Sequence, residues 1–321
     1  MEGNILTGDK RKMTDAEAEQ PPLKRQISKS GLYCFKSFRA ERKGERDDMQ
    51  DACTLLDDVT ESFSALPSTV SRVAYFGVFD GHGGARASHY ASETLHKNLF
   101  KRFPKTDTGH NDKEIKRCLI NTFKQTDEEF LKQASAKKPV WKDGSTAVCV
   151  IAVNNVLYIA NLGDSKAMLC RFNEERQKLS LIPLSREHNP TMYEERMRIQ
   201  KAGGTVRDGR VQGILEVSRS IGDGRFKHCG VSCLPDIKKC QLTDNDRYLL
   251  LACDGLWKGF NPEATLEFVQ KIVEDKTIKT SPGKTLEETQ FDTACNKLAS
   301  EAIRRGSSDN VTVALISISK T

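Results

Sequence analysis

The sequence has 321 residues, of which 37% are hydrophobic and 29% are charged, and its formal net charge at pH 7 is +6. This balance is typical of a soluble globular chain with enough apolar residues for a sizeable core. No apolar run approaches the length of a membrane span, and the N-terminus lacks the apolar segment of a signal peptide. We therefore expect no membrane association and a cytoplasmic and nuclear location, in which the ten cysteines stay reduced.

Residues 1–31 differ from the rest of the chain. They are polar, lack aromatic residues and carry two basic clusters, Lys10-Arg11-Lys12 and Lys24-Arg25. Such a segment has too little apolar surface to fold, so we predict a disordered basic tail over residues 1–31 and one folded domain over residues 32–321. The clusters suit either a bipartite nuclear-import signal or a solvated tail. Nucleic-acid binding is disfavoured because no aromatic side chain is there to stack on bases.

Residues 75–79 are a continuous apolar run and predict a strand that is followed directly by candidate functional residues. It leads into Asp80-Gly81-His82-Gly83-Gly84, where the glycines can take positive φ and bring backbone oxygens close to a ligand. Taken alone, this loop is either a cation-binding loop or a glycine-rich turn with a solvated aspartate. The spacing of apolar residues then predicts helices over residues 87–103 and 115–130.

A β-hairpin is predicted next. Residues 146–153 and 156–161 are rich in β-forming residues, and Asn154-Asn155 joins them with two residues that tolerate positive φ. Residues 167–172 predict a further strand that continues the same meander.

Two helices with clear ends are predicted in the C-terminal part. Asn261-Pro262-Glu263 supplies an N-cap, a proline at the first helical position and an acidic first turn. Apolar spacing predicts another helix through residues 291–303, and Gly306 suits its end.

Two more aspartates lie at strand ends. Asp254 follows the apolar run of residues 248–253, and Asp309 precedes the strand predicted over residues 311–316. Together with Asp80 they are far apart in sequence and can meet only in the folded chain. Because Mg²⁺ and Mn²⁺ prefer oxygen ligands, three such carboxylates favour a binuclear metal site over a solvated turn.

These residues resemble a known family, the metal-dependent protein phosphatases of the protein phosphatase 2C type. The match covers roughly residues 32–319, with its motifs in family order. The motifs are Arg46-Asp47-Asp48-Met49-Gln50-Asp51-Ala52, Asp80-Gly81-His82-Gly83-Gly84, Asp143-Gly144-Ser145-Thr146-Ala147, Leu162-Gly163-Asp164-Ser165, Glu187-His188-Asn189-Pro190, Val217-Ser218-Arg219-Ser220-Ile221-Gly222-Asp223, Asp254-Gly255 and Ser308-Asp309-Asn310-Val311-Thr312.

The resemblance implies an α+β fold, a four-layer α/β/β/α sandwich of two antiparallel sheets flanked by helices. It also implies a protein serine/threonine phosphatase in kinase signalling that hydrolyses phosphoserine and phosphothreonine monoesters with a metal-activated water. The expected cofactors are Mg²⁺ or Mn²⁺, two per subunit. The expected partners are phosphorylated proteins, integrin-linked kinase among them, and the chain is expected to be a monomer.

Metal ligands are also implied by the resemblance. Asp80 would bridge both ions, the Gly81 carbonyl would bind one of them, and Asp254 and Asp309 would bind the other.

Two further residues have an implied part in catalysis. Arg46 would hold two phosphate oxygens with its planar guanidinium, and His82 would protonate the departing serine or threonine oxygen. The neighbouring His188 is expected to make a structural hydrogen bond near a flap, residues 186–240, that shapes substrate specificity.

Departures from the commoner family pattern concern the periphery of the site. Gln50 stands where many members have Glu, and Lys258 stands where many have an Asp that helps to make a third metal site. We expect the Lys258 ammonium to lie near Asp164 and Asp254 and to reverse the local field there, so the third site is in doubt. Asp164 is therefore a less secure ligand than Asp80, Asp254 or Asp309, and Asp51 is a second weaker candidate.

Two other classes of function are less consistent with the sequence than an active phosphatase. A catalytically weak scaffold with the phosphatase fold would have lost a core ligand, whereas Asp80, Asp254 and Asp309 are all present. A metal-dependent nuclease would need a basic groove for nucleic acid, whereas the excess positive charge lies mostly in the tail.

Overall fold

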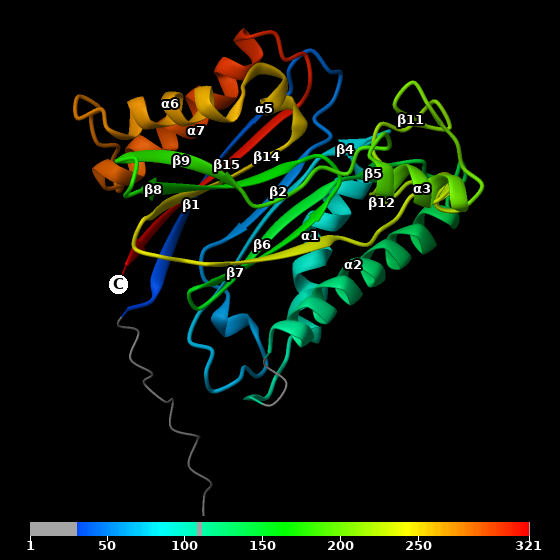
Figure 1. Cartoon of the computed structure of the whole chain (residues 1–321), viewed down its shortest axis with the longest axis horizontal. Helices are drawn as coiled ribbons and strands as arrows, with labels where there is room; N and C mark the ends of the chain where they lie inside the picture. The colour runs from blue at the N-terminus through cyan, green and yellow to red at the C-terminus, as the bar shows by residue number, and fades with distance from the viewer. Residues whose placement is uncertain (1–30, 108–110, 321) are drawn as a thin grey trace, which may run out of the picture.

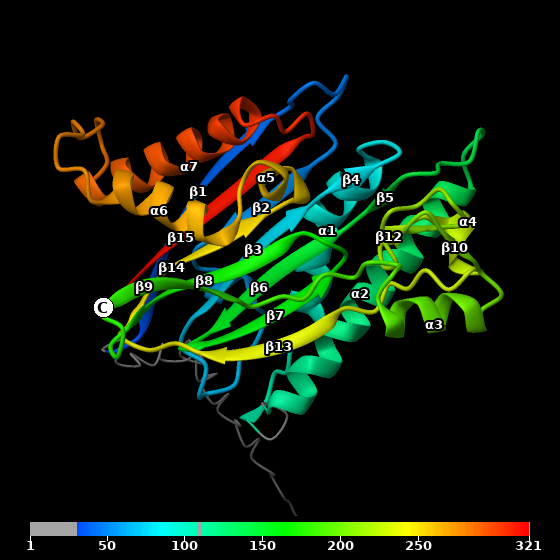
Figure 2. The ribbon, with the colours of Figure 1, turned by 45° about the horizontal axis from the view of Figure 1, so that its top comes forward.

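The computed structural model describes residues 31–107 and 111–320, so the predicted tail lies outside the described residues except for its last one. Two five-stranded antiparallel sheets pack face to face between two layers of helices (Figures 1 and 2). This is the four-layer α+β sandwich that the family resemblance implied. No helix in these two stretches has the length and apolar character needed to cross a bilayer.

The first sheet has the strand order β13-β7-β6-β3-β2. Its strands are β13 (Asp236–Gln241), β7 (Val156–Leu162), β6 (Ala147–Val153), β3 (Val73–Phe79) and β2 (Ala52–Leu56). Every residue of β3 is buried, with Tyr75 and Phe79 facing the helices while Phe76 and Val78 face the other sheet. Burial on both faces explains why this segment is a continuous apolar run.

The second sheet has the order β1-β15-β14-β8-β9. Its strands are β1 (Tyr33–Arg42), β15 (Val311–Lys320), β14 (Asp246–Ala252), β8 (Lys166–Asn173) and β9 (Lys178–Pro183). The expectation that residues 167–172 continue the first meander is wrong, because this segment is β8 and pairs with β14. The chain crosses between the sheets after β7, and Gly163 allows this turn with a φ of 103°.

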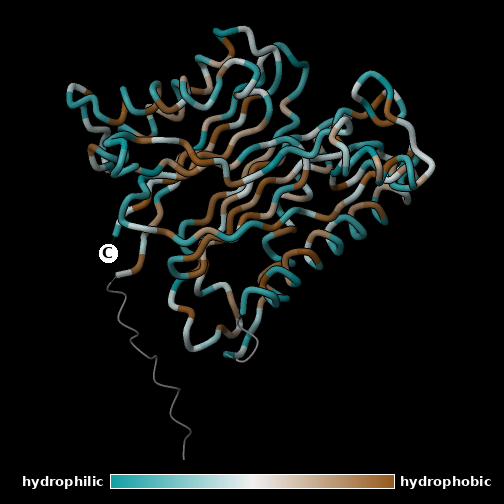
Figure 3. Tube along the Cα trace, viewed as in Figure 1, coloured by the Kyte–Doolittle hydropathy of each residue, from teal (hydrophilic) through white to brown (hydrophobic). Residues whose placement is uncertain are grey.

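Helices cover both outer faces of the sandwich. The first sheet is covered by α1 (Arg86–Arg102) and α2 (Asp112–Ser135), and the second by α6 (Pro262–Val273) and α7 (Leu286–Arg304). The Asn261 side chain caps α6 as predicted, accepting the Ala264 N–H. Figure 3 shows the apolar residues concentrated along the packed strands and the polar residues along the outer helices. A single turn of 3-10 helix, η1 (Thr60–Ser62), lies between β2 and β3.

Smaller elements gather at the end of the sandwich where β3 and β14 finish (Figure 2). They are β4 (Gly81–His82), β5 (Gly144–Ser145), β12 (Ile221–Gly222), the hairpin β10 (Val206–Arg207) and β11 (Arg210–Val211), and the helices α3 (Tyr193–Lys201), α4 (Gly224–Lys227) and α5 (Asp254–Gly259). The predicted flap is shorter than residues 186–240, because residues 236–241 form β13 of the main sheet. We call residues 186–235 the flap.

Candidate metal centre and active site

Asp80 lies between β3 and β4, and Thr146 holds its backbone on both sides. The Asp80 N–H donates to Thr146 Oγ1 over 3.2 Å, and the Thr146 N–H donates to the Asp80 carbonyl over 2.9 Å. Gly81 has no room for a side chain, since an added Cβ would lie 2.1 Å from the Gln50 carbonyl oxygen. The sequence interpretation quoted Thr146 in a motif but gave it no role, because its two hydrogen bonds exist only in the folded chain.

The four candidate metal-ligand carboxylates that line one cleft of about 410 Å³ come from separate elements, and Arg46, Gly81 and His82 line the same cleft. They are those of Asp80, Asp164, Asp254 and Asp309. A fifth carboxylate, Asp51, is 3% exposed and directly precedes β2. The structure thus brings together the three strand-end aspartates, as predicted, and both weaker candidates lie beside them.

Crowding raises the pKa values of these carboxyl groups. Burial is the main cause at Asp80, where repulsion from Asp51 adds to it and the pKa rises well above its usual range. Burial, followed by repulsion from Asp254, raises the pKa of Asp164 to about 7. Burial also raises the pKa of Asp51 to about 6. Such a cluster needs cations if all of its members are to be ionised at neutral pH.

The donor set fits hard divalent cations. Neither carboxylate oxygen of the buried Asp51 makes a hydrogen bond of normal geometry within the described residues. One oxygen of Asp51, one of Asp80 and the Cys253 sulfur lie within 4.8 Å of one another. Burial raises the pKa of the Cys253 thiol well above its usual range, and the thiol donates to the Asn310 carbonyl over 3.4 Å. The oxygens, which Mg²⁺ and Mn²⁺ prefer, are therefore the ligands on offer.

Lys258 gives part of the cluster a cation of its own. It lies one turn after Asp254 on α5, and its Nζ is 2.7 Å from Asp254 Oδ2 and 2.6 Å from Asp309 Oδ2. The sequence interpretation expected it near Asp164 and Asp254, whereas the structure places it between Asp254 and Asp309. Burial opposes the charge on Lys258, but its two carboxylate partners outweigh burial and raise its pKa.

Arg46 reaches the same carboxylate from the loop between β1 and β2. Its Nη2 donates to Asp309 Oδ2 over 2.8 Å, while 59% of the side chain remains exposed. Asn310 fixes this loop, because its side chain donates to the Asp48 carbonyl over 3.0 Å and accepts the Gln50 N–H over 2.7 Å. Sequence reasoning gave Asn310 no role, although it sits in a quoted motif.

His82 contacts a further carboxylate of the same cleft, that of Asp223, which is not a candidate metal ligand. Its Nε2 lies 2.6 Å from Oδ2 of Asp223, whose side chain is only 3% exposed. Burial lowers the pKa of His82, but the charge and hydrogen bond of Asp223 outweigh burial and raise it. The sequence motif contains Asp223 as its last residue but does not indicate its role, because its partner His82 lies 141 positions away in the chain.

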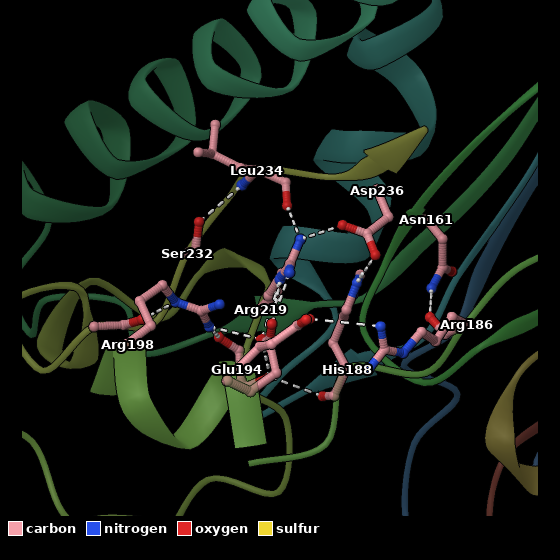
Figure 4. Close-up of polar contacts among 12 residues, drawn as sticks. Asn161, Arg186, His188, Glu194, Arg198, Arg219, Ser232, Leu234 and Asp236 are labelled. Atoms are coloured by element: carbon pink, nitrogen blue, oxygen red, sulfur yellow. Dashed lines mark hydrogen bonds and ion pairs between the residues drawn. The ribbon is translucent and has the colours of Figure 1, made fainter. Parts of the chain in front are cut away.

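Ion pairs tie the flap to the first sheet (Figure 4). Arg219 lies 2.6 Å from Glu195 Oε1 through Nη2 and 2.8 Å from Asp236 Oδ1 through Nη1. His188 Nε2 lies 3.1 Å from Asp236 Oδ2, and His188 Nδ1 accepts the Gly163 N–H over 3.1 Å. The network therefore reaches the residue before the Asp164 carboxylate. His188 makes the structural hydrogen bond that was expected of it.

The flap forms one wall of the cleft. Its contribution includes Arg210, Ile214 and Arg225, and Lys142 lies along the same cleft. Arg210 is paired with Glu216, and Ile214 is 53% exposed. The cleft therefore has an acidic floor with basic and apolar side chains along its wall.

Comparisons with known proteins agree with this geometry. A family profile, Protein phosphatase 2C, matches residues 36–311. The integrin-linked kinase-associated serine/threonine phosphatase 2C of Homo sapiens is 57% identical over 315 residues, covering 97% of this chain and 80% of the relative. Probable protein phosphatase 2C 67 of Oryza sativa subsp. japonica is 39% identical over 297 residues, covering 89% of this chain and 76% of the relative.

Solved structures share the fold. A sex determining protein of C. elegans aligns with a TM-score of 0.71 and 26% identity, covering 90% of this chain and 65% of that chain. Serine-threonine phosphatase 2C from Toxoplasma gondii aligns with a TM-score of 0.70 and 21% identity, covering 89% of this chain and 95% of that chain. The chain therefore belongs to the protein phosphatase 2C family of metal-dependent protein serine/threonine phosphatases.

Proposed function

We propose that this phosphatase hydrolyses phosphoserine and phosphothreonine monoesters of proteins with two Mg²⁺ or Mn²⁺ ions per subunit. The observation that carries this proposal is a single cleft that unites four carboxylates with Arg46 and His82. Asp80, the Gly81 carbonyl, Asp254 and Asp309 would hold the ions, and Asp51 and Asp164 would support them. When bound, two such ions lower the pKa of a water and neutralise charge on phosphoryl oxygens.

The protein's own groups supply binding and protonation. Arg46 has donors beyond the one that contacts Asp309, and it would hold two phosphoryl oxygens at once. A water oxygen forms a bond to phosphorus and loses one proton to bulk water, while the bond from phosphorus to the serine or threonine oxygen breaks. The electron pair of the broken bond stays on the leaving oxygen, which takes a proton from His82.

The proposal also covers the partners of the protein and its location in the cell. The basic and apolar wall of the cleft suits a phosphorylated protein segment, and the relative's name points to integrin-linked kinase as a partner in kinase signalling. We infer a monomeric phosphatase domain over residues 32–321 that acts in cytoplasm and nucleus, with the basic clusters at residues 10–12 and 24–25 as the import signal.

Hydrolysis of a phosphothreonine peptide with Mn²⁺, with Mg²⁺ and with EDTA tests the proposal. We expect phosphate release with either ion, at least a hundredfold loss in EDTA, and an equal loss in Asp80→Asn, which corresponds to about 2.7 kcal/mol of barrier. Activity within about tenfold of wild type in Asp80→Asn would contradict the assigned metal site.

The contact of Lys258 with two candidate ligands supports a second possibility, a catalytically weak scaffold. If the ammonium kept divalent ions out of the cleft, the chain would bind phosphoproteins without hydrolysing them. Calorimetry with Mn²⁺ separates the two functions, since an enzyme shows saturable binding at the concentrations that restore activity and a scaffold shows neither.

A further inference from the structure

A small three-stranded sheet brings two distant residues together beside the cleft. His82 on β4 pairs with Gly144 on β5, and Gly144 pairs with Gly222 on β12. Asp223 follows Gly222 directly, so it leaves this sheet close to the histidine. The sheet thus sets the distance between the two side chains through backbone pairing.

The contact between them is short and sheltered. His82 Nε2 and Asp223 Oδ2 are 2.6 Å apart, a length typical of a charge-assisted hydrogen bond. The Asp223 side chain is 3% exposed and makes no other ion pair within residues 31–107 and 111–320. Its negative charge is therefore directed at one imidazole nitrogen.

Gly144 leaves the space that this contact occupies. A Cβ added to Gly144 would lie 2.1 Å from Asp223 Oδ2 and 2.2 Å from His82 Nε2. Any side chain at this position would push the two groups aside. Glycine is required here for room, and the pair lies directly against its bare backbone.

The backbone holds Asp223 independently of the metal cluster. Its φ is 53°, a left-handed conformation that Asp and Asn adopt more readily than other side-chain-bearing residues. The Asp223 N–H donates to the Asp143 carbonyl over 3.0 Å, and the preceding Gly222 N–H donates to Asp127 Oδ1 over 2.7 Å. The carboxylate is therefore preorganised before any substrate binds.

We propose that Asp223 is the positioning residue for His82. It accepts the Nε2–H and fixes the ring, so that Nδ1 donates the proton to the departing serine or threonine oxygen. Nδ1 is available for this step because it makes no hydrogen bond to another described residue. A carboxylate that holds one imidazole nitrogen while the other handles the substrate proton is an established way to orient a histidine. The inference rests on the proposed role of His82 as proton donor.

The dependence on the leaving group tests this role. A phosphothreonine peptide releases a strongly basic alkoxide that needs the proton, whereas p-nitrophenyl phosphate releases a weakly basic phenolate that does not. We expect Asp223→Asn to lower kcat for the peptide by about 10- to 100-fold. The KM for the peptide and the kcat for p-nitrophenyl phosphate should each change by less than about threefold. Asn keeps the shape and the tolerance of positive φ, so the variant should fold.

Two further variants complete the experiment. Gly144→Ala keeps both charged groups but separates them, and it should show the same selective loss. Asp236→Asn removes the partner of a second, fully buried histidine, His188, and should affect both substrates alike. The double variant Asp223→Asn/His82→Gln should lose no more peptide activity than His82→Gln alone.

The outcomes distinguish the positioning role of Asp223 from the proton-donor role of His82. If His82→Gln is selective for the peptide but Asp223→Asn is not, the positioning role is wrong and the proton donor stands. If His82→Gln itself lowers activity on both substrates equally, the proposed proton donor is wrong and the inference fails with it. Additive losses in the double variant would also overturn the positioning role, because the two residues would then act independently.

Discussion

The ammonium of Lys258 lies between two carboxylates that would otherwise face a divalent ion, with Nζ 2.7 Å from Asp254 and 2.6 Å from Asp309. Metal binding to these aspartates has to weaken both contacts or displace the lysine. The ammonium therefore acts as a competing cation whose charge is already in place. This competition lowers the affinity of the site without removing any ligand.

We predict that Lys258→Met binds Mn²⁺ about tenfold more tightly than wild type, a gain of about 1.4 kcal/mol by isothermal titration calorimetry. Methionine keeps a similar length and removes the competing charge. Lys271→Met, at an exposed position of α6, should leave the affinity unchanged. Weaker binding by Lys258→Met would mean that the lysine helps to assemble the site. Lys258→Asp should go further and add a third, weaker binding event.

At the scale of single residues, the sequence identified the groups whose chemistry is visible in the local pattern. Asp80 and Asp254 follow buried strands and Asp309 precedes one, so their convergence could be expected. Asp223 and Asn310 could not be assigned in this way. Each acts through tertiary contacts, and no spacing along the chain encodes which partner a buried polar side chain will meet.

Among the elements, helix α3 of the flap depends on a buried acid. Glu195 is 2% exposed and accepts hydrogen bonds from Arg219, Arg198 and Ser218. Burial opposes its charge, but these donors, led by Arg219, outweigh burial and lower the pKa of Glu195. One carboxylate therefore holds α3 to the other segments of the flap.

We predict that Glu195→Ala destabilises the protein by roughly 2–3 kcal/mol in urea unfolding, less than the 3–5 kcal/mol of fully buried pairs because its arginine partners are partly exposed. Glu194→Ala is the matched control. Its side chain is 71% exposed, and its 3.5 Å ion pair with Arg186 should contribute less than about 1 kcal/mol. Equal effects of the two substitutions would show that the buried network does not hold α3 within the flap.

Element types followed from sequence patterns more readily than the pairing of strands did. Apolar spacing indicated α1, α2 and α7, and the residues 261–263 marked the start of α6. The assignment of residues 167–172 to the first sheet was wrong because a strand's own pattern does not say which neighbour it will pair with. That choice is made by the turn at Gly163, which carries the chain from one sheet to the other.

For the molecule as a whole, the tail and the domain should be separable. Strand β1 begins at Tyr33, after both basic clusters in the sequence. We predict that deleting residues 1–30 leaves the specific activity within about twofold of wild type and moves the protein toward the cytoplasm, because the basic clusters are lost. Fractionation or imaging of a tagged protein measures this shift. An unchanged nuclear fraction would exclude these clusters as the import signal.

The stability of the whole metal-free protein should depend on pH through the Asp164 carboxyl. The carboxyl pKa of Asp164 rises from 3.8 in the reference state to about 7 in the fold, mainly through burial and then through repulsion from Asp254. The folded state therefore binds more protons than the unfolded state between about pH 4 and pH 7, so stability falls as pH rises through this window. Below about pH 4 both states are protonated and the penalty vanishes.

Asp164→Asn should accordingly stabilise the protein in EDTA at pH 8, by up to a few kcal/mol, and have little effect at pH 4. Asp208→Asn, at an exposed position of the flap, should change stability at neither pH. With saturating Mn²⁺ the wild-type protein should instead be more stable than Asp164→Asn. Bound cations stabilise the ionised cluster, and the substitution removes one of its charges. Urea unfolding of both variants at pH 4 and pH 8, with EDTA and with Mn²⁺, measures all of these differences. If the metal-free wild-type protein were as stable as Asp164→Asn at pH 8, ionised Asp164 would not destabilise the fold. The acidic cluster would then need no cation to offset repulsion among its carboxylates.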